Sequence, residues 1–224
     1  TTPSHQYPTT HTMSKERRRD LLEQANRHNI IIIEDDYESE FNYGSEPIPA
    51  LKSLDSEGRV IYVGSLSKTL APGIRLGYMV APREFIRQAK ALRRIMLRHP
   101  PSNNQFIIAQ FLKRGYHDAL IRRISHTLYH RSKLMKSLLD ELLPGATQKP
   151  DFGGSSFWVR GPQSLDCREL AQSARERGLL IETGDTFFYP GTEKLNYFRL
   201  GFSSISADKI KVGLPLLSEI IGAD

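Results

Sequence analysis

The chain has 224 residues, of which 39% are hydrophobic and 25% charged, a composition typical of a folded globular protein with a sizeable core. It holds no apolar stretch near the roughly 18 residues of a membrane helix. Its single cysteine, Cys167, excludes an internal disulfide framework and fits a cytoplasmic protein. The net charge of +6 permits an anionic partner, but the arginines at 17–19, 93–94 and 122–123 lie on predicted helices without a DNA-binding motif. We interpret them as solvated helix faces.

The first part of the chain predicts an alternation of helix and strand. Ser14 can cap a helix that runs to about residue 28. The four isoleucines at 30–33 are β-branched and continuously apolar, which predicts a strand over 30–35 that is buried on both faces. Further strands are expected at 60–64 and at about 76–80. Because no two-residue hairpin turn joins these segments, the pattern favours an α/β fold with a parallel or mixed sheet.

The second part of the chain predicts helices first and then a small α+β region. Three helices are expected, at about 83–98, 104–115 and 117–143. Strands at 157–159, 179–183 and 197–201 and a helix at 166–178 should follow. A last helix begins at about residue 207, capped by Ser206, and Pro215 predicts a kink or an early break in it. We expect a boundary near residues 98–118, which divides the chain into 1–100 and 101–224.

A lysine, two hydroxyls and an arginine follow the strand at 60–64 within one short segment: Ser65, Ser67, Lys68 and Arg75. A lysine can form a Schiff base with an aldehyde when desolvation and nearby cations lower its pKa. Hydroxyls, backbone N–H groups and an arginine suit a phosphate. Pyridoxal 5′-phosphate (PLP) carries both an aldehyde and a phosphate. An ordinary surface lysine is the alternative, but the neighbouring hydroxyls and strand end favour the cofactor.

Acidic residues end the strand at 30–35. A carboxylate such as that of Asp35 can keep the ring nitrogen of PLP protonated, and Tyr37 can hydrogen-bond the ring hydroxyl. Alternatively, these acidic residues only terminate the strand and cap the next turn, and Tyr37 only packs. Since ligands collect at the carboxyl ends of strands in such sheets, Asp35 and Ser65 are expected to share one pocket.

Arg199 lies within the apolar strand at 197–201, where an arginine is seldom buried without a partner. Its planar fork suits the α-carboxylate of an amino acid. A structural salt bridge to an internal aspartate or glutamate is an equally good interpretation of the residue alone.

Four segments together carry a resemblance to a known family: PSHQYPT at 3–9, IIEDDYESEF at 32–41, PALKSLD at 49–55 and GSLSKTLAPG at 64–73. They are similar to the aminotransferase-like domain of MocR-type regulators, the branch of GntR-family transcription factors that joins a winged helix to a fold type I PLP domain. The resemblance is dense over residues 1–85 and looser beyond. It implies an α/β fold, with a mostly parallel sheet flanked by helices and a smaller α+β C-terminal domain.

The resemblance also implies roles for individual residues. Lys68 corresponds to the lysine of the internal aldimine, Asp35 to the partner of the pyridinium nitrogen and Tyr37 to the residue facing the ring hydroxyl. The phosphate ligands correspond to Ser65, Ser67 and Arg75. Arg199 corresponds to the carboxylate-binding arginine. No metal ligand is implied.

Two departures accompany the resemblance. Tyr7 stands where aminotransferases of the family carry an asparagine that contacts the ring hydroxyl, and Thr10 stands where they carry a glycine, which suggests a changed turn. In addition, the strands, phosphate loop and stacking aromatic residue that the family carries upstream have no counterpart in this sequence. We therefore expect the C-terminal part of such a domain.

The resemblance implies a homodimer that takes an amino acid or amine as ligand through Lys68 and contacts DNA only through a winged helix outside this chain. A true class I/II PLP-dependent aminotransferase is the first alternative. The second is a cofactor-free remnant that serves in dimer contacts.

Overall fold

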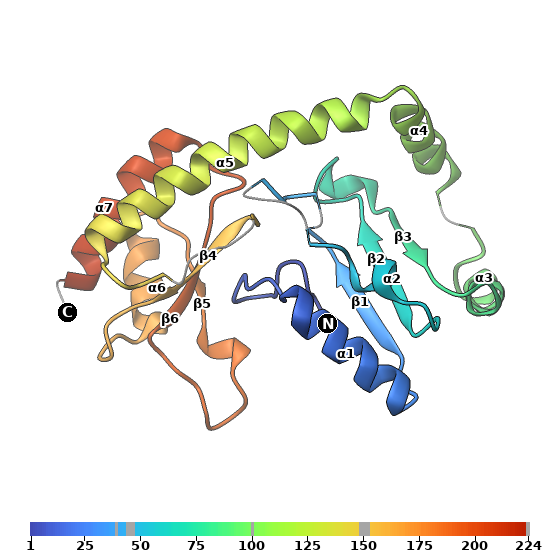
Figure 1. Cartoon of the computed structure of the whole chain (residues 1–224). Helices are drawn as coiled ribbons and strands as arrows, with labels where there is room; N and C mark the ends of the chain where they lie inside the picture. Colours follow the sequence, from blue (N-terminus) through green and yellow to red (C-terminus); the bar gives the residue numbers. More distant parts are fainter. Residues whose placement is uncertain (39, 44–47, 100, 148–152, 223–224) are drawn as a thin grey trace. The chain divides into compact units, whose positions relative to one another are not determined.

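The computed structural model describes residues 1–38, 40–43, 48–99, 101–147 and 153–222 (Figure 1). Its contacts divide the chain into two units, each described here by itself. Unit 1 comprises residues 1–6 and 11–125, and unit 2 comprises residues 7–10 and 126–224. The predicted division into 1–100 and 101–224, with a cofactor domain and a small domain, stays a prediction. Among the described residues, no helix is long and apolar enough to cross a membrane.

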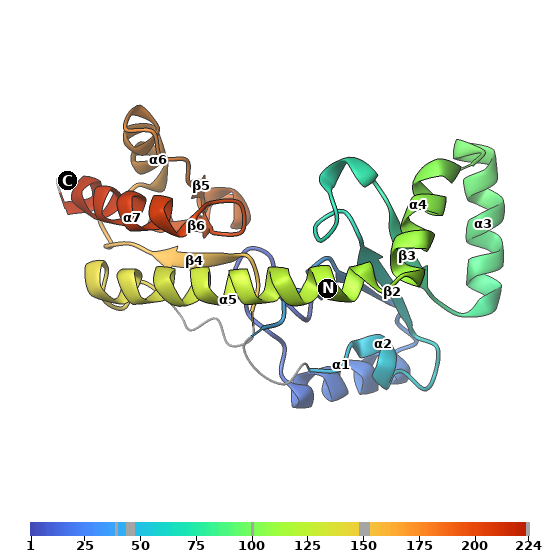
Figure 2. The same ribbon diagram turned by 90° about the horizontal axis from the view of Figure 1, so that it is seen from above.

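Unit 1 is built on a three-stranded sheet in the order β1-β2-β3. The strands are β1 (Ile32–Asp36), β2 (Val60–Ser65) and β3 (Gly77–Val80). β1 and β2 are parallel, whereas β2 and β3 are antiparallel, so the expected mixed sheet is confirmed. Helices α1 (Lys15–Arg27) and α2 (Leu51–Leu54) lie side by side along this sheet (Figure 2). The Ser14 side chain caps α1 by accepting a hydrogen bond from the Arg17 N–H, as expected.

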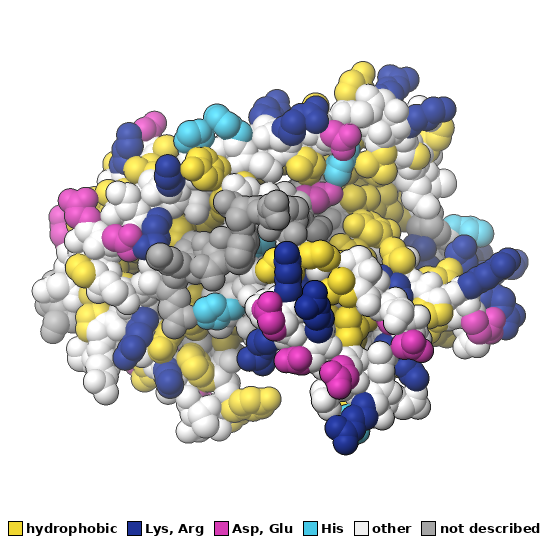
Figure 3. Space-filling model, viewed as in Figure 1, with side chains coloured by type: hydrophobic (Ala, Val, Ile, Leu, Met, Phe, Trp, Pro, Cys, Tyr) yellow, Lys and Arg dark blue, Asp and Glu magenta, His cyan; other side chains and the backbone are white. Residues whose placement is uncertain are grey.

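The core of this unit lies between the sheet and these two short helices. Its buried side chains come from α1, α2, β1 and β2: Leu22, Ala25, Ile32, Leu51 and Val60. The expectation that the isoleucine strand is buried on both faces is wrong for the described chain, because Ile31 and Ile33 are 51% and 58% exposed. Side chains alternate between the faces of a strand, and α1 and α2 cover only one of them. Apolar side chains accordingly reach the molecular surface (Figure 3).

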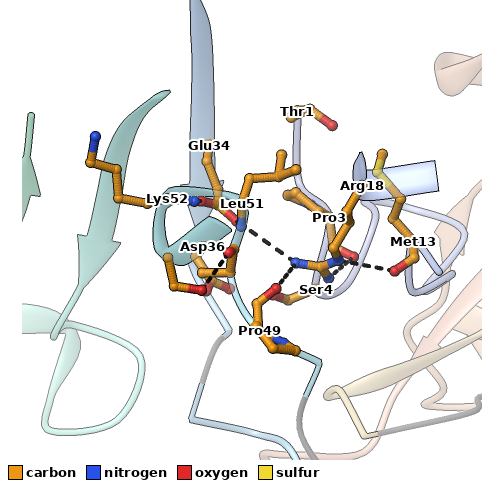
Figure 4. A network of polar contacts seen from close by, with 12 residues as sticks. Thr1, Pro3, Ser4, Met13, Arg18, Glu34, Asp36, Pro49, Leu51 and Lys52 are labelled. Atoms are coloured by element: carbon orange, nitrogen blue, oxygen red, sulfur yellow. Dashed lines mark hydrogen bonds and ion pairs between the residues drawn. The ribbon is translucent and has the colours of Figure 1, made fainter. Parts of the chain in front are cut away.

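The interpretation of residues 17–19 as a solvated helix face is wrong for Arg18, whose side chain is completely buried. Its guanidinium donates hydrogen bonds to three backbone carbonyls, those of Pro3, Met13 and Pro49, at 2.8–3.0 Å (Figure 4). Its Nη1 also lies 3.9 Å from the carboxylate of Glu34. A buried guanidinium needs this many acceptors, which only the folded chain brings together.

Three helices follow the first sheet where the sequence predicts them. They are α3 (Arg83–Leu97), α4 (Ser102–Lys113) and α5 (Tyr116–Leu142), and the division between the two units falls within α5. α3 buries none of its side chains, and Ile95 on it is 83% exposed.

Unit 2 is built on a three-stranded antiparallel sheet in the order β4-β6-β5. The strands are β4 (Ser156–Arg160), β5 (Glu182–Thr183) and β6 (Tyr197–Gly201). Helix α6 (Cys167–Glu176) packs against α7 (Ala207–Gly222), and α7 and the last turns of α5 lie along the sheet (Figures 1 and 2). The central strand β6 buries Phe198 and Leu200. The predicted strands and helices of this region are therefore confirmed, although β5 is shorter than expected.

Of the kink or early break expected at Pro215, the early break is wrong, since α7 continues through this proline to Gly222, and the kink stays a prediction. A proline inside a helix costs about 3 kcal/mol. The turns after it bury Leu217, Ile220 and Ile221, which outweighs that cost.

Candidate functional site

The carboxyl ends of β1 and β2 lie at the same edge of the first sheet. The strands are parallel, and their register pairs Asp35 with Val63 and Asp36 with Gly64. The segments that follow β1 and β2 therefore lie at the same edge of the sheet, as expected for a shared site.

Lys68 lies at this edge beside residues that follow β1. Its Nζ lies 3.1 Å from an oxygen of Glu38 and 4.5 Å from the centre of the Tyr37 ring. The side chain of Glu38 is 3% exposed and that of Lys68 is 43% exposed. The expected environment of desolvation and nearby cations is thus not what surrounds Lys68, because its ion-pair partner is a carboxylate. Glu38 was not among the predicted site residues, although it directly follows Tyr37 in the sequence.

The three acidic residues at the end of β1 have different surroundings. Glu34 is buried and accepts hydrogen bonds from the backbone N–H groups of Leu51 and Lys52, which caps α2. Asp36 is also buried and accepts a bond from the Tyr62 hydroxyl at 3.0 Å. Asp35 lies between them on the opposite face and is exposed. Strand alternation thus leaves Asp35 as the one of the three whose carboxylate faces outward.

The segment after β2 carries the predicted phosphate ligands. The backbone N–H of Ser67 donates to the Ser65 hydroxyl at 3.3 Å, so these two residues are close together. Arg75 is exposed and has a φ of +52°, in the left-handed region that non-glycine residues rarely adopt. The Asn104 side chain donates to the carbonyl of Ile74 and ties this turn to α4. Such strained backbone positions cluster at ligand sites.

His5 is a buried residue of unit 1 that the sequence did not single out. It is 4% exposed, and neither ring nitrogen has a hydrogen-bond partner among the described residues. Burial lowers the pKa of His5 below its ordinary value of 6.5, although the carboxylates of Glu38 and Asp36 act in the opposite direction. Burial in the folded chain therefore favours the neutral form of this imidazole.

We expect the free energy of unfolding to depend on His5 at acidic pH. A lowered pKa in the folded state means that the unfolded chain takes up the proton first, so the contribution of neutral His5, present above pH 6.5, is lost as pH falls from 6.5 through the lowered value. In urea unfolding at a series of pH values, wild type should lose stability below pH 6.5 relative to His5→Gln. Replacing the exposed His28 with glutamine is the matched control. Parallel pH profiles for wild type and His5→Gln would contradict the prediction.

Arg199 belongs to unit 2 and has the structural salt bridge that was one of its two interpretations. It lies on β6 opposite Glu182 of β5, and its Nη1 donates to Glu182 at 2.8 Å. The Tyr7 hydroxyl donates to the other oxygen of Glu182 at 2.6 Å, and the Tyr7 ring centre lies 5.0 Å from the guanidinium carbon. Neither Tyr7 nor Glu182 was predicted as a partner of Arg199. The pairing of β5 with β6 brings Glu182 to Arg199, and Tyr7 reaches the same pair from a segment about 175 residues earlier in the chain.

Thr10 keeps a backbone conformation that glycine adopts easily. Its φ is +62°, in the left-handed region. The replacement of glycine by threonine therefore does not by itself abolish a glycine-type turn after Tyr7.

Comparison with known proteins identifies the class to which this fold and site belong. Residues 2–214 match the family described as Aminotransferase class I and II. The structure superposes on that of the kynurenine aminotransferase from Pyrococcus horikoshii with a TM-score of 0.92 and 32% identity, over 100% of this chain and 55% of that one. The expected PLP-transferase fold is confirmed.

Two relatives illustrate two kinds of protein to which this chain is similar. The HTH-type transcriptional regulator TauR from Rhodobacter capsulatus is 42% identical over 99% of this chain and 46% of its own length. Aromatic-amino-acid aminotransferase 1 from Thermococcus litoralis is 34% identical over 99% of this chain and 53% of its own. The chain thus spans about half the length of these relatives.

The chain belongs to the class I and II aminotransferase family. Its resemblance to the aminotransferase-like domain of MocR-type regulators is confirmed by its regulator relatives. Family membership implies PLP as the cofactor, and the chemistry of the residues present fits it. The Lys68 amine, after β2, lies over the ring of Tyr37, after β1. The exposed carboxylate of Asp35 near the end of β1 and the nearby hydroxyls of Ser65 and Ser67 complete the set.

Proposed function

We propose that this chain is the PLP-binding effector part of a MocR-type transcriptional regulator, which senses an amino acid or amine. The observation that carries the proposal is the position of Lys68, whose amine lies over Tyr37 where the carboxyl ends of β1 and β2 meet. The high similarity to a regulator over 99% of the chain supports the regulatory part.

Each predicted residue has a distinct task in this proposal. When bound, PLP supplies an aldehyde that a primary amine can attack and a ring that withdraws electrons. Lys68 provides the amine of the protein, and Asp35 provides a carboxylate that keeps a proton on the ring nitrogen. Tyr37 would donate to the ring hydroxyl. Ser65, Ser67 and Arg75 would hold the phosphate, and Arg199 would hold the acid group of the ligand.

The proposal extends to the whole protein. An amine or amino acid that competes with Lys68 for the cofactor changes the arrangement of the domain, and this change reaches DNA through a winged helix on another part of the protein. A homodimer with a cytoplasmic location fits this role. The aminotransferase relatives favour a second candidate function, that of an enzyme that transfers amino groups with the same residues.

Titration with PLP is the experiment that tests the proposal. We expect a visible absorption band in wild type and its complete loss in Lys68→Ala, whereas Lys90→Ala, at an exposed position on α3, should keep the band. No band in a chain shown to be folded would contradict cofactor binding by this chain and favour the cofactor-free alternative.

A second measurement separates the regulator from the enzyme. Amines and amino acids that change the band are added to the full-length protein, and the affinity for its own promoter DNA and the release of a keto acid are measured. The regulator should change its DNA affinity without sustained release of keto acid. Sustained turnover with unchanged DNA affinity would favour the aminotransferase.

A further inference from the structure

Glu182 lies between two hydrogen-bond donors of unit 2, Arg199 and Tyr7. One of its oxygens accepts a hydrogen bond from Arg199 at 2.8 Å, and the other accepts one from the Tyr7 hydroxyl at 2.6 Å. Cross-strand pairing places Glu182 and Arg199 on the same face of the antiparallel pair. The carboxylate of Glu182 is therefore bound much as a ligand carboxylate would be, with Arg199 donating to one oxygen and Tyr7 to the other.

The hydrogen bonding of Arg199 is incomplete in this arrangement. Its Nε is buried and has no acceptor among the described residues, so the pair with Glu182 is not the two-bond fork that an arginine can form with a carboxylate. The Arg199 side chain is 16% exposed, whereas that of Glu182 is 41% exposed. Glu182 can thus turn towards solvent, while Arg199 is held within the sheet.

Tyr7 remains a hydrogen-bond donor at neutral pH. Partial desolvation and the bond to Glu182 raise the pKa of its phenol above the ordinary value of 10.0. An acid group that replaced Glu182 would find the same two donors, Tyr7 and Arg199.

We propose that Glu182 is a specificity residue: its carboxylate occupies the acid-binding position formed by Arg199 and Tyr7, and an acid-bearing ligand must displace it. This inference rests on the proposed function in taking Arg199 as the residue that binds the ligand's acid group. It adds Tyr7 as a second donor to that group. It also predicts that Glu182 weakens the binding of every carboxylate while leaving amines without an acid group unaffected.

The test uses acetate as the probe and the chain without cofactor. Binding is followed by NMR through the Nε–H signal of Arg199, assigned by its loss in Arg199→Lys, at constant ionic strength. The neutral side chain that Glu182→Gln introduces competes with acetate less well than the Glu182 carboxylate, because it no longer forms charge-assisted hydrogen bonds with Arg199 and Tyr7. Glu182→Gln should therefore bind acetate at least about tenfold more tightly than wild type. Adding Tyr7→Phe to Glu182→Gln should weaken acetate binding again.

The matched control is Glu219→Gln, which removes the same charge from an exposed pair with Arg177 in the same unit. It should leave acetate binding unchanged. A second variant, Glu182→Asp, keeps the charge on a side chain one methylene shorter, which should weaken at least one of the two hydrogen bonds. Its affinity for acetate should lie between those of wild type and Glu182→Gln.

Two results would overturn the inference. One is an unchanged or weaker acetate affinity in Glu182→Gln and Glu182→Asp, and the other is an equal gain in Glu219→Gln. Since the titration needs no cofactor, its outcome is separate from that of the PLP experiment. A Lys68-dependent band together with no gain in Glu182→Gln would refute only the role of Glu182.

Discussion

Replacing Arg18 with methionine should lower the free energy of unfolding by about 3–5 kcal/mol, because it removes one partner of a fully buried ion pair. Glu34 would lose its counter-charge in an interior where burial already raises the pKa of its carboxyl group. The carbonyls of Pro3, Met13 and Pro49 would each lose the bond from Arg18, although that of Pro3 keeps the backbone N–H of Met13 as a donor (Figure 4). Methionine keeps most of the apolar stem of the arginine side chain, so the measured loss of stability reflects the lost polar contacts. Urea unfolding followed by circular dichroism measures it.

Two further variants distinguish the contribution of the buried contacts of Arg18 to stability from the effect of removing one positive charge. Arg19→Met removes the same charge from an exposed position on the same helix and should change stability by no more than about 0.5 kcal/mol. Combining Arg18→Met with Glu34→Gln removes the unpaired buried charge and should recover part of the loss. Equal stabilities of Arg18→Met and Arg19→Met would show that the network does not stabilise the fold.

Replacing Phe198 with alanine should cost about 3–5 kcal/mol in unit 2. Phe198 lies on the central strand β6 and is 0% exposed, so truncation leaves a cavity in the middle of the second sheet. The single tryptophan, Trp158, lies on the neighbouring strand β4 and stacks on Tyr197, so its fluorescence follows the unfolding of this unit. We expect the fluorescence transition to move to a lower urea concentration.

Two substitutions serve as references for Phe198→Ala. Phe198→Leu leaves a smaller cavity and should cost less, while Tyr189→Ala, at a side chain that is 84% exposed, should change stability by no more than about 0.5 kcal/mol. If Phe198→Ala were no more costly than Tyr189→Ala, the second sheet would not form the core described here.

Local signals in the sequence were sufficient for most of the secondary structure. The Ser14 cap, the helical periodicity after residue 82 and the apolar strand at 197–201 each depend on residues close together in the chain, and the structure confirms them. Predictions failed where distant residues decide the outcome. The isoleucine strand is covered on one face only, and α7 passes through Pro215 because its later turns are buried.

In the candidate site, too, local sequence signals predicted some residues, while contacts between distant residues were missed. Lys68 and Tyr37 were predicted from the segments after two strands, and the parallel pairing of β1 and β2 brings them together. Glu38 was missed because nothing in the sequence indicates that its side chain turns towards Lys68. For Arg199, the residue alone left a ligand carboxylate and an internal partner equally open, and the register of β5 with β6 supplies Glu182.

The sequence by itself therefore determined the class of fold, through local periodicity and the resemblance of its motifs to a known family, and it supplied the prediction of which residues carry PLP chemistry. The tertiary structure alone decided which charges are paired. Arg18 meets Glu34, Lys68 meets Glu38, and Arg199 meets Glu182 across 16, 30 and 17 residues of chain. The physical reason is that a buried charge is stable only beside acceptors or a counter-charge, and strand pairing and helix packing, rather than sequence distance, set which ones lie within reach.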